Sequence, residues 1–200
     1  MNTPTNDKKV ILITGASRGI GAFTAVLLAQ QGHQIVINYA RNDLEANQLV
    51  EKIKAAGGTA SAFKADISQS HQVEQLFEYV IQNYGQVDIL INNAGIECFS
   101  EFDALTEAEI EQTIATNLTG AILLTRLVVP GMKSQRFGRI INMASTAGKH
   151  GPAYGAVYGA TKAGLIAFTQ SLRGELSEHG ILSTAICPGF ATDGGIYDEI

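Results

Sequence analysis

Residues 9–21 read KVILITGASRGIG, a short run of mostly apolar residues followed at once by a glycine-rich turn. The run is typical of a strand buried on both faces, and apolar residues at helical spacing follow the turn. Gly15, Gly19 and Gly21 lack a Cβ where a backbone would approach a phosphate at a helix N-terminus. Their spacing, G-x-x-x-G-x-G, differs from the common G-x-G-x-x-G fingerprint. The stretch predicts a strand, a phosphate cradle and a helix; a tight, closely packed turn is the alternative.

The same alternation of strand and helix continues along the chain. Apolar runs predict strands at residues 9–14, 35–38, 61–65, 87–91, 139–143 and 182–186. Helical patterns cover residues 19–31, 43–56, 69–84, 106–132 and 154–179. This alternation predicts an α/β fold, in which a doubly wound parallel sheet of about six strands has helices on both faces. We expect a single domain over residues 1–200. Ligands of such sheets bind beyond the carboxyl ends of the strands.

The residues after the second predicted strand indicate which dinucleotide would bind. NAD enzymes place an acidic residue here against the ribose 2′-hydroxyl, but residues 38–41 read NYAR, and the first carboxylate after the strand is Asp43. Arg18 in the glycine turn and Arg41 provide guanidinium groups that suit a 2′-phosphate. We therefore expect NADP(H) rather than NAD(H). A solvated loop charge at Arg41 and a helix cap at Asp43 are the alternatives.

A second group of residues suits acid–base chemistry. Tyr158 and Lys162 are four residues apart and share one face of a predicted helix, and Ser145 follows the fifth predicted strand. A free tyrosine titrates near pH 10, so a phenol that transfers protons near neutrality needs a stabilised phenolate. The lysine ammonium would lower its pKa through space. An ordinary helix surface pair, and a turn residue at position 145, are the alternatives.

Taken together, these pieces resemble the short-chain dehydrogenase/reductase family over about residues 9–189. They occur in the family's order: TGASRGIG at 14–21, Asp66, NNAG at 92–95, Asn117, Ser145, YGATK at 158–162 and PG at 188–189. The resemblance implies a Rossmann-type fold and an NAD(P)-dependent oxidoreductase acting on CH–OH or C=O groups. Within the family the sequence is most similar to 3-oxoacyl-acyl-carrier-protein reductases and acetoacetyl-CoA reductases.

The resemblance implies a role for each matched residue. Tyr158 would be the proton donor in reduction, and Lys162 would bind the nicotinamide ribose and shift Tyr158. Ser145 would polarise the carbonyl, and Asn117 would hold a water in the proton relay. The cofactor would contact Gly15, Ser17, Arg18, Gly19, Ile20, Gly21, Arg41, Asp66, Ile67, Asn93, Ala94, Gly95, Tyr158, Lys162, Pro188, Gly189 and Thr192. The expected substrate-pocket lining is Glu97, Cys98, Phe99, His150, Tyr154 and Phe190.

Two features depart from the family's pattern. Thr192 falls one place earlier after PG at 188–189 than the threonine that relatives place near the nicotinamide carboxamide. The chain is also expected to be short at its C-terminus, without the family's last strand. The leading interpretation is an NADP(H)-dependent enzyme that interconverts a ketone, such as a 3-oxoacyl thioester, and a secondary alcohol. The alternative is a catalytically weak or inactive NADP(H)-binding sensor or assembly protein.

Composition and charge limit the kinds of ligand and partner that the protein is expected to bind. The net charge of -5 argues against a general nucleic-acid surface. Cys98 and Cys187 lie far apart and the four histidines show no ligand spacing, so we expect no disulfide framework and no metal site. The polar start lacks a signal-peptide core, and no uninterrupted apolar stretch is long enough to span a membrane. We expect a cytoplasmic protein that acts on a small carbonyl or alcohol. Because relatives pair through the helices at 106–132 and 154–179, we also expect a homodimer, with a tetramer left open.

Overall fold

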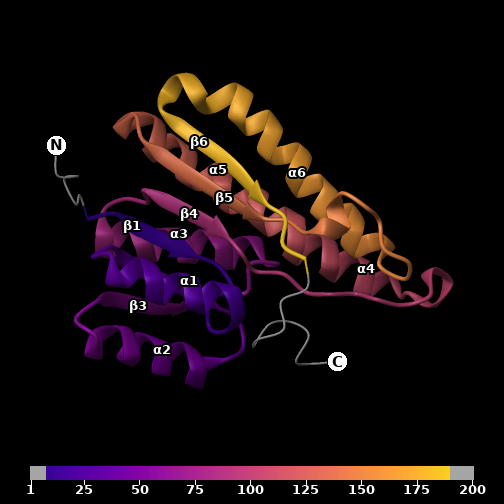
Figure 1. The fold of residues 1–200 in the computed structure, drawn as a ribbon, viewed down its shortest axis with the longest axis horizontal. Coiled ribbons are helices and arrows are strands. Elements are labelled where there is room, and N and C mark those ends of the chain that lie inside the picture. Colours follow the sequence, from indigo (N-terminus) through magenta and orange to yellow (C-terminus); the bar gives the residue numbers. More distant parts are fainter. Residues whose placement is uncertain (1–7, 190–200) are drawn as a thin grey trace.

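The computed structural model describes residues 8–189, and a six-stranded sheet lies at its centre (Figure 1). The strands are β1 (Val10–Ile13), β2 (Gln34–Tyr39), β3 (Thr59–Lys64), β4 (Ile89–Asn92), β5 (Gly138–Met143) and β6 (Ile181–Ile186). They are all parallel and lie in the order β3-β2-β1-β4-β5-β6. This is the doubly wound order, in which strands are added on one side of β1 up to β3 and on its other side from β4 onward. The predicted α/β fold is confirmed.

Helices cover both faces of this sheet. They are α1 (Gly19–Gln30), α2 (Asp43–Ala55), α3 (Ser70–Tyr84), α4 (Glu107–Ile114), α5 (Gly120–Gln135) and α6 (Ala156–Leu176). Alternate strand residues point to opposite faces. On one face Ile11, Ile13, Ile35 and Ile37 pack against α1 and α2. On the other, Val10, Leu12, Leu90 and Ile140 pack against α3, α5 and the end of α6. The strands are therefore apolar on both sides because both sides are buried.

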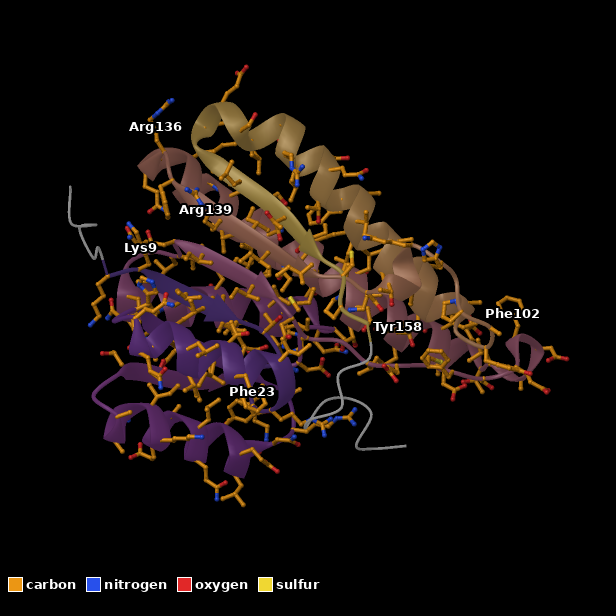
Figure 2. The ribbon with its side chains drawn as sticks, viewed as in Figure 1. Lys9, Phe23, Phe102, Arg136, Arg139 and Tyr158 are labelled. Carbon is orange, nitrogen blue, oxygen red and sulfur yellow. The ribbon has the colours of Figure 1, made fainter. Side chains whose placement is uncertain are left out.

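Helix α1 packs against the sheet through small residues, and its larger apolar residues face away from the core. The larger apolar residues Phe23 and Leu27 are 62% and 59% exposed, and Figure 2 shows Phe23 on the outside of the helix. The buried positions are the small residues Gly21, Ala25 and Ala29. Small side chains let the helix backbone approach the sheet closely. The helix predicted over residues 19–31 is confirmed, and its larger apolar residues face outward.

The helix predicted over residues 106–132 is interrupted. Thr106 and Glu109 form a capping box that starts α4. A π-helical turn at Ala115–Thr119 then separates α4 from α5, which runs on to Gln135 and holds Pro130 in its interior. A π turn accommodates one extra residue and commonly occurs at functional sites. The break therefore singles out the central residue of the turn, Asn117.

The last long helix begins later than predicted. Tyr154 has a φ of 63°, in the left-handed region, and Gly155 is the N-cap of α6. The helix therefore starts at Ala156 rather than at residue 154. It ends at Leu176 and is followed by a 3₁₀ turn at Ser177–His179 and then Gly180, whose φ is 75°. Tyr158 consequently lies in the first turn of α6.

One helical stretch of the described chain, Glu107–Gln135, is long and apolar enough by length and composition to cross a membrane, and an 18-residue window within it has a mean hydropathy of 1.3. A single stretch of this kind is weak evidence, because core helices meet the same criteria. Leu124, Val128 and Met132 from this stretch lie in the core beside the sheet.

Candidate active site

A pocket with a volume of about 330 Å³ opens at the carboxyl ends of the strands. It collects residues that follow all six strands. Figure 2 places Tyr158 at this end of the sheet, whereas Lys9, Arg136 and Arg139 lie at the other. The predicted site residues that line it are Gly15, Ser17, Arg18, Gly19, Ile20, Arg41, Asp66, Ile67, Asn93, Ala94, Gly95, Ser145, Tyr158, Lys162, Pro188 and Glu97, with Gly189 at its edge.

Two predicted site residues of the described part of the chain, Gly21 and Asn117, are not among those that line the pocket. Gly21 is buried, and a Cβ there would lie 2.6 Å from Asn93 Nδ2, so this glycine permits close packing beneath the turn. Asn117 is 1% exposed and lies behind the pocket wall. Thr192 lies outside the described residues, as does Phe190 of the expected substrate lining. Cys98, Phe99, His150 and Tyr154 from that expected lining are also not among the pocket residues.

The glycine turn is bound tightly to the segment after β4. Gly15 has a φ of 60°, and a Cβ there would lie 2.7 Å from Ala94 Cα, so only glycine fits. Asn93 Nδ2 donates to the carbonyls of Thr14 (2.8 Å) and Gly15 (3.0 Å). Thr14 Oγ1 accepts from the backbone N–H groups of Asn93 and Ala94, both at 3.0 Å. Sequence reasoning missed Thr14; its signal was a hydroxyl at the end of an apolar run.

The end of β2 contributes a second supporting side chain that was missed. Asn38 is 1% exposed, and its Nδ2 donates to the Ala65 carbonyl at 2.8 Å. Its Oδ1 accepts from the Gly15 N–H at 3.4 Å. One amide thus ties together the carboxyl ends of β1, β2 and β3. The signal was a lone amide directly after the apolar residues 35–37.

The two arginines and the carboxylate that follows β2 are arranged differently around the pocket. Arg18 and Arg41 line it, but Asp43 does not. Asp43 instead accepts from Lys64 Nζ at 2.8 Å and from the Tyr39 hydroxyl at 3.2 Å. The hydrogen bond from Lys64 lowers the pKa of Asp43. The pocket wall after β2 therefore presents a guanidinium group while Asp43 is held by other partners, which suits a phosphate better than a ribose hydroxyl.

Ser145, Tyr158 and Lys162 meet at the end of β5. Ser145 has an extended backbone, and its Oγ accepts from the Ala147 N–H at 3.1 Å. Tyr158 and Lys162 are 7% and 4% exposed and, as predicted, lie on one face of α6. Lys162 Nζ lies 5.6 Å from the centroid of the Tyr158 ring and donates to the Met143 carbonyl at 2.8 Å. A Cβ on Gly95 would lie 3.3 Å from this Nζ, so Gly95 leaves space for the ammonium group.

Burial is the largest influence on the pKa values of Tyr158 and Lys162. Burial raises the pKa of Tyr158, against the lowering effect of its hydrogen bond with Ser145, and the charge of Glu97 raises it further. Burial also lowers the pKa of Lys162 to about 8, while Glu97 acts in the opposite direction. Lys162 is not among the groups that shift the Tyr158 pKa in this structure, and its ammonium group donates to the Met143 carbonyl instead. At neutral pH the phenol therefore holds its proton and can serve as an acid.

Asn117 has a supporting position in the structure. Its Oδ1 accepts from the Ile96 N–H at 2.8 Å, and its Nδ2 donates to the Ile96 carbonyl at 2.9 Å. Its Nδ2 also donates to Thr161 Oγ1 at 3.3 Å. The π turn thus joins α6 to the loop after β4, and the predicted role in a water relay stays a prediction. Within residues 8–189, no cluster of three or more His, Cys, Asp or Glu side chains could hold a metal ion.

The chain matches the short chain dehydrogenase family over residues 9–195. It is 41% identical to the ketoacyl reductase HetN of Nostoc sp., covering 94% of this chain and 65% of HetN. It is also 41% identical to a 3-oxoacyl-[acyl-carrier-protein] reductase of Synechocystis sp., covering 92% of this chain and 75% of that protein. The chain thus spans about two thirds to three quarters of these relatives.

Solved structures agree with this match. A metagenomic short-chain oxidoreductase in complex with NADP superposes with a TM-score of 0.88 at 36% identity, covering 93% of this chain and 85% of that one. A variant of the actinorhodin polyketide ketoreductase with NADPH has the same TM-score at 35% identity, covering 94% and 73%.

Proposed function

Because this chain belongs to the short-chain dehydrogenase family, whose members are NAD(P)-dependent oxidoreductases, we propose that it is an NADP(H)-dependent carbonyl reductase. It would reduce a ketone to a secondary alcohol or catalyse the reverse reaction. The observation that carries the proposal is the meeting of Ser145, Tyr158 and Lys162 in the pocket that the glycine turn also lines. The names of the relatives favour a 3-oxoacyl thioester as the substrate class.

The pocket fits a dinucleotide along its length. Gly15, Ser17 and Gly19 line the pocket directly before and at the start of α1, where a phosphate cradle would lie. Residues 93–95 and Asp66 line the pocket beyond the turn and would hold the adenosine part, while Lys162 would bind the nicotinamide ribose. Bound NADP(H) would supply or accept the hydride.

The chain's own residues would move the proton. Tyr158 would donate its hydroxyl proton to the carbonyl oxygen as the carbonyl carbon is reduced, and the Ser145 hydroxyl would hydrogen-bond the same oxygen. Lys162 would then stabilise the phenolate, since a cation near an anion favours its charged form. In the oxidative direction the phenolate would accept the alcohol proton.

The charged residues in the glycine turn and after β2 favour binding of NADP(H) over NAD(H). Arg18 and Arg41 line the pocket, and Asp43 is bound to Lys64 and Tyr39 instead of facing it. Arginine forks bind phosphate through two parallel hydrogen bonds. The two structural neighbours, which hold NADP and NADPH, agree with this preference.

We also propose a homodimer in the cytoplasm, assembled through α5 and α6. The α4–α5 region exposes apolar side chains, with Ile114 at 40% and Ile122 at 37%. A partner helix would remove this apolar surface from water, which favours association.

Replacing Tyr158 with Phe tests the proposal, because it removes the transferable proton and keeps the ring. Turnover of ketones with NADPH should fall by at least about a hundredfold, while NADPH binding, followed by fluorescence, should change little. Tyr79→Phe is the matched control, since its ring stacks on Phe63 and Tyr79 does not line the pocket. Near-normal turnover by the Tyr158 variant would show that another group is the acid. NADPH binding without turnover of any ketone by the unaltered protein would favour the non-catalytic alternative.

A further inference from the structure

A short segment, residues 96–100, begins in the pocket wall beside the catalytic group, where Ile96 and Glu97 line the pocket, and it is held at both ends. At its start, the Asn117 side chain forms two hydrogen bonds with the Ile96 backbone, at 2.8 and 2.9 Å. At its end, the Ser100 N–H donates to the Tyr154 carbonyl at 2.9 Å. The three residues between these anchors are therefore held in place by contacts to the π turn and to the loop before α6.

This segment brings a carboxylate to the reacting groups. Glu97 is partly buried and lines the pocket together with Ser145, Tyr158 and Lys162. The Phe99 ring lies 5.8 Å from the Tyr158 ring, centroid to centroid, which places this wall against the proposed acid. The charge of Glu97 also raises the pKa of both Tyr158 and Lys162. A negative charge on Glu97 opposes formation of the Tyr158 phenolate. The proton transfer by Tyr158 therefore does not explain why position 97 carries a carboxylate.

We propose that Glu97 determines substrate specificity by selecting ketones that carry a cationic group close to the carbonyl and by excluding anionic ones. The inference rests on the proposed carbonyl reductase function. An ammonium group on the substrate would form a charge-assisted hydrogen bond with the carboxylate. A substrate carboxylate would instead meet a like charge in a partly buried site, where such repulsion is weakly screened.

Three small ketones that differ only in one substituent near the carbonyl test this inference: an ammonium, a carboxamide and a carboxylate. The unaltered protein should favour the ammonium ketone over the carboxamide by about tenfold or more in kcat/KM, the range expected for a hydrogen bond to a charged group. Glu97→Gln should remove most of this preference, measured as the ratio of kcat/KM for the ammonium ketone to kcat/KM for the carboxamide ketone within the same variant. Glu101→Gln is the matched control, because it makes the same charge change at an exposed position near the same segment.

Binding of the three ketones to the NADP⁺-loaded protein, measured by calorimetry, provides a readout independent of turnover and should give the same ranking. The same ranking in the Glu97→Gln variant as in the unaltered protein would overturn the inference. Should that variant not fold, the ranking by the unaltered protein still decides, since equal use of all three ketones or preference for the carboxylate would overturn it. Absence of turnover with all three would overturn the carbonyl reductase proposal itself, whereas equal turnover would overturn only the role of Glu97.

Discussion

Replacing Lys162 with Met should abolish activity and yet stabilise the cofactor-free protein. Burial lowers the pKa of this lysine from 10.5 to about 8. Below about pH 8 the lysine is charged in both the folded and the unfolded state, and the folded state bears the full cost of burying that charge. The difference between the two pKa values corresponds to about 3 kcal/mol. Because the folded-state pKa is depressed, this cost is present in full below pH 8 and disappears as the pH rises through 10.5.

The methionine side chain has a similar length and no charge. It also removes the hydrogen bond from Nζ to the Met143 carbonyl, which we set at about 1 kcal/mol. The expected net gain in the free energy of unfolding is therefore about 2 kcal/mol near pH 7 and close to zero near pH 9.5, where the lysine is largely neutral in the folded state.

Urea unfolding followed by circular dichroism, without cofactor and at both pH values, measures this gain. The control is Lys52→Met, at an exposed position on α2, whose effect should be small at both pH values. A loss of stability near pH 7, or a gain of the same size at both pH values, would refute the argument from burial. The expected result is a site residue that lowers the stability of the fold it serves.

Replacing both Arg18 and Arg41 with Ala should weaken NADPH binding much more than NADH binding, by about 1.5–3 kcal/mol for each charge-assisted hydrogen bond to the 2′-phosphate that the change removes. Fluorescence titration with each cofactor measures this, and equal weakening for the two would rule out recognition of a 2′-phosphate by this pair. Light scattering at micromolar concentration should give the mass of a homodimer, and a stable monomer would contradict assembly through α5 and α6.

The parts of the fold that follow from local chemistry could be predicted from the sequence. The β-branched, apolar residues of β1 and β2 are buried on both faces, and this produces the runs that indicate parallel strands. The glycines at 15 and 19 have positive φ values, which few other residues adopt. These local requirements are strong enough to place the pocket at the carboxyl end of the sheet.

Features that depend on tertiary contacts could not be predicted. Tyr154 adopts a positive φ without being a glycine, so nothing in its sequence showed that α6 begins only at Ala156. The outward position of Phe23 depends on how closely α1 packs against the sheet. The pKa of Tyr158 is raised chiefly by burial and further by the charge of Glu97, and the four-residue spacing of Tyr158 and Lys162 reveals neither cause.

The π turn at Ala115–Thr119 also bears on how this gene could gain or lose single codons. Elsewhere in a regular helix, deletion of one residue rotates everything beyond it by about 100° and turns its buried face towards solvent. Here the surplus residue is already contained within one turn, so its deletion would leave α4 and α5 with their original faces towards the core. The chain would keep its fold but lose the displacement that aims Asn117 at Ile96. Loss of one codon at this point would therefore loosen the segment that carries Glu97 while leaving the protein folded. The shape of the pocket could thus change in evolution without a change in the core.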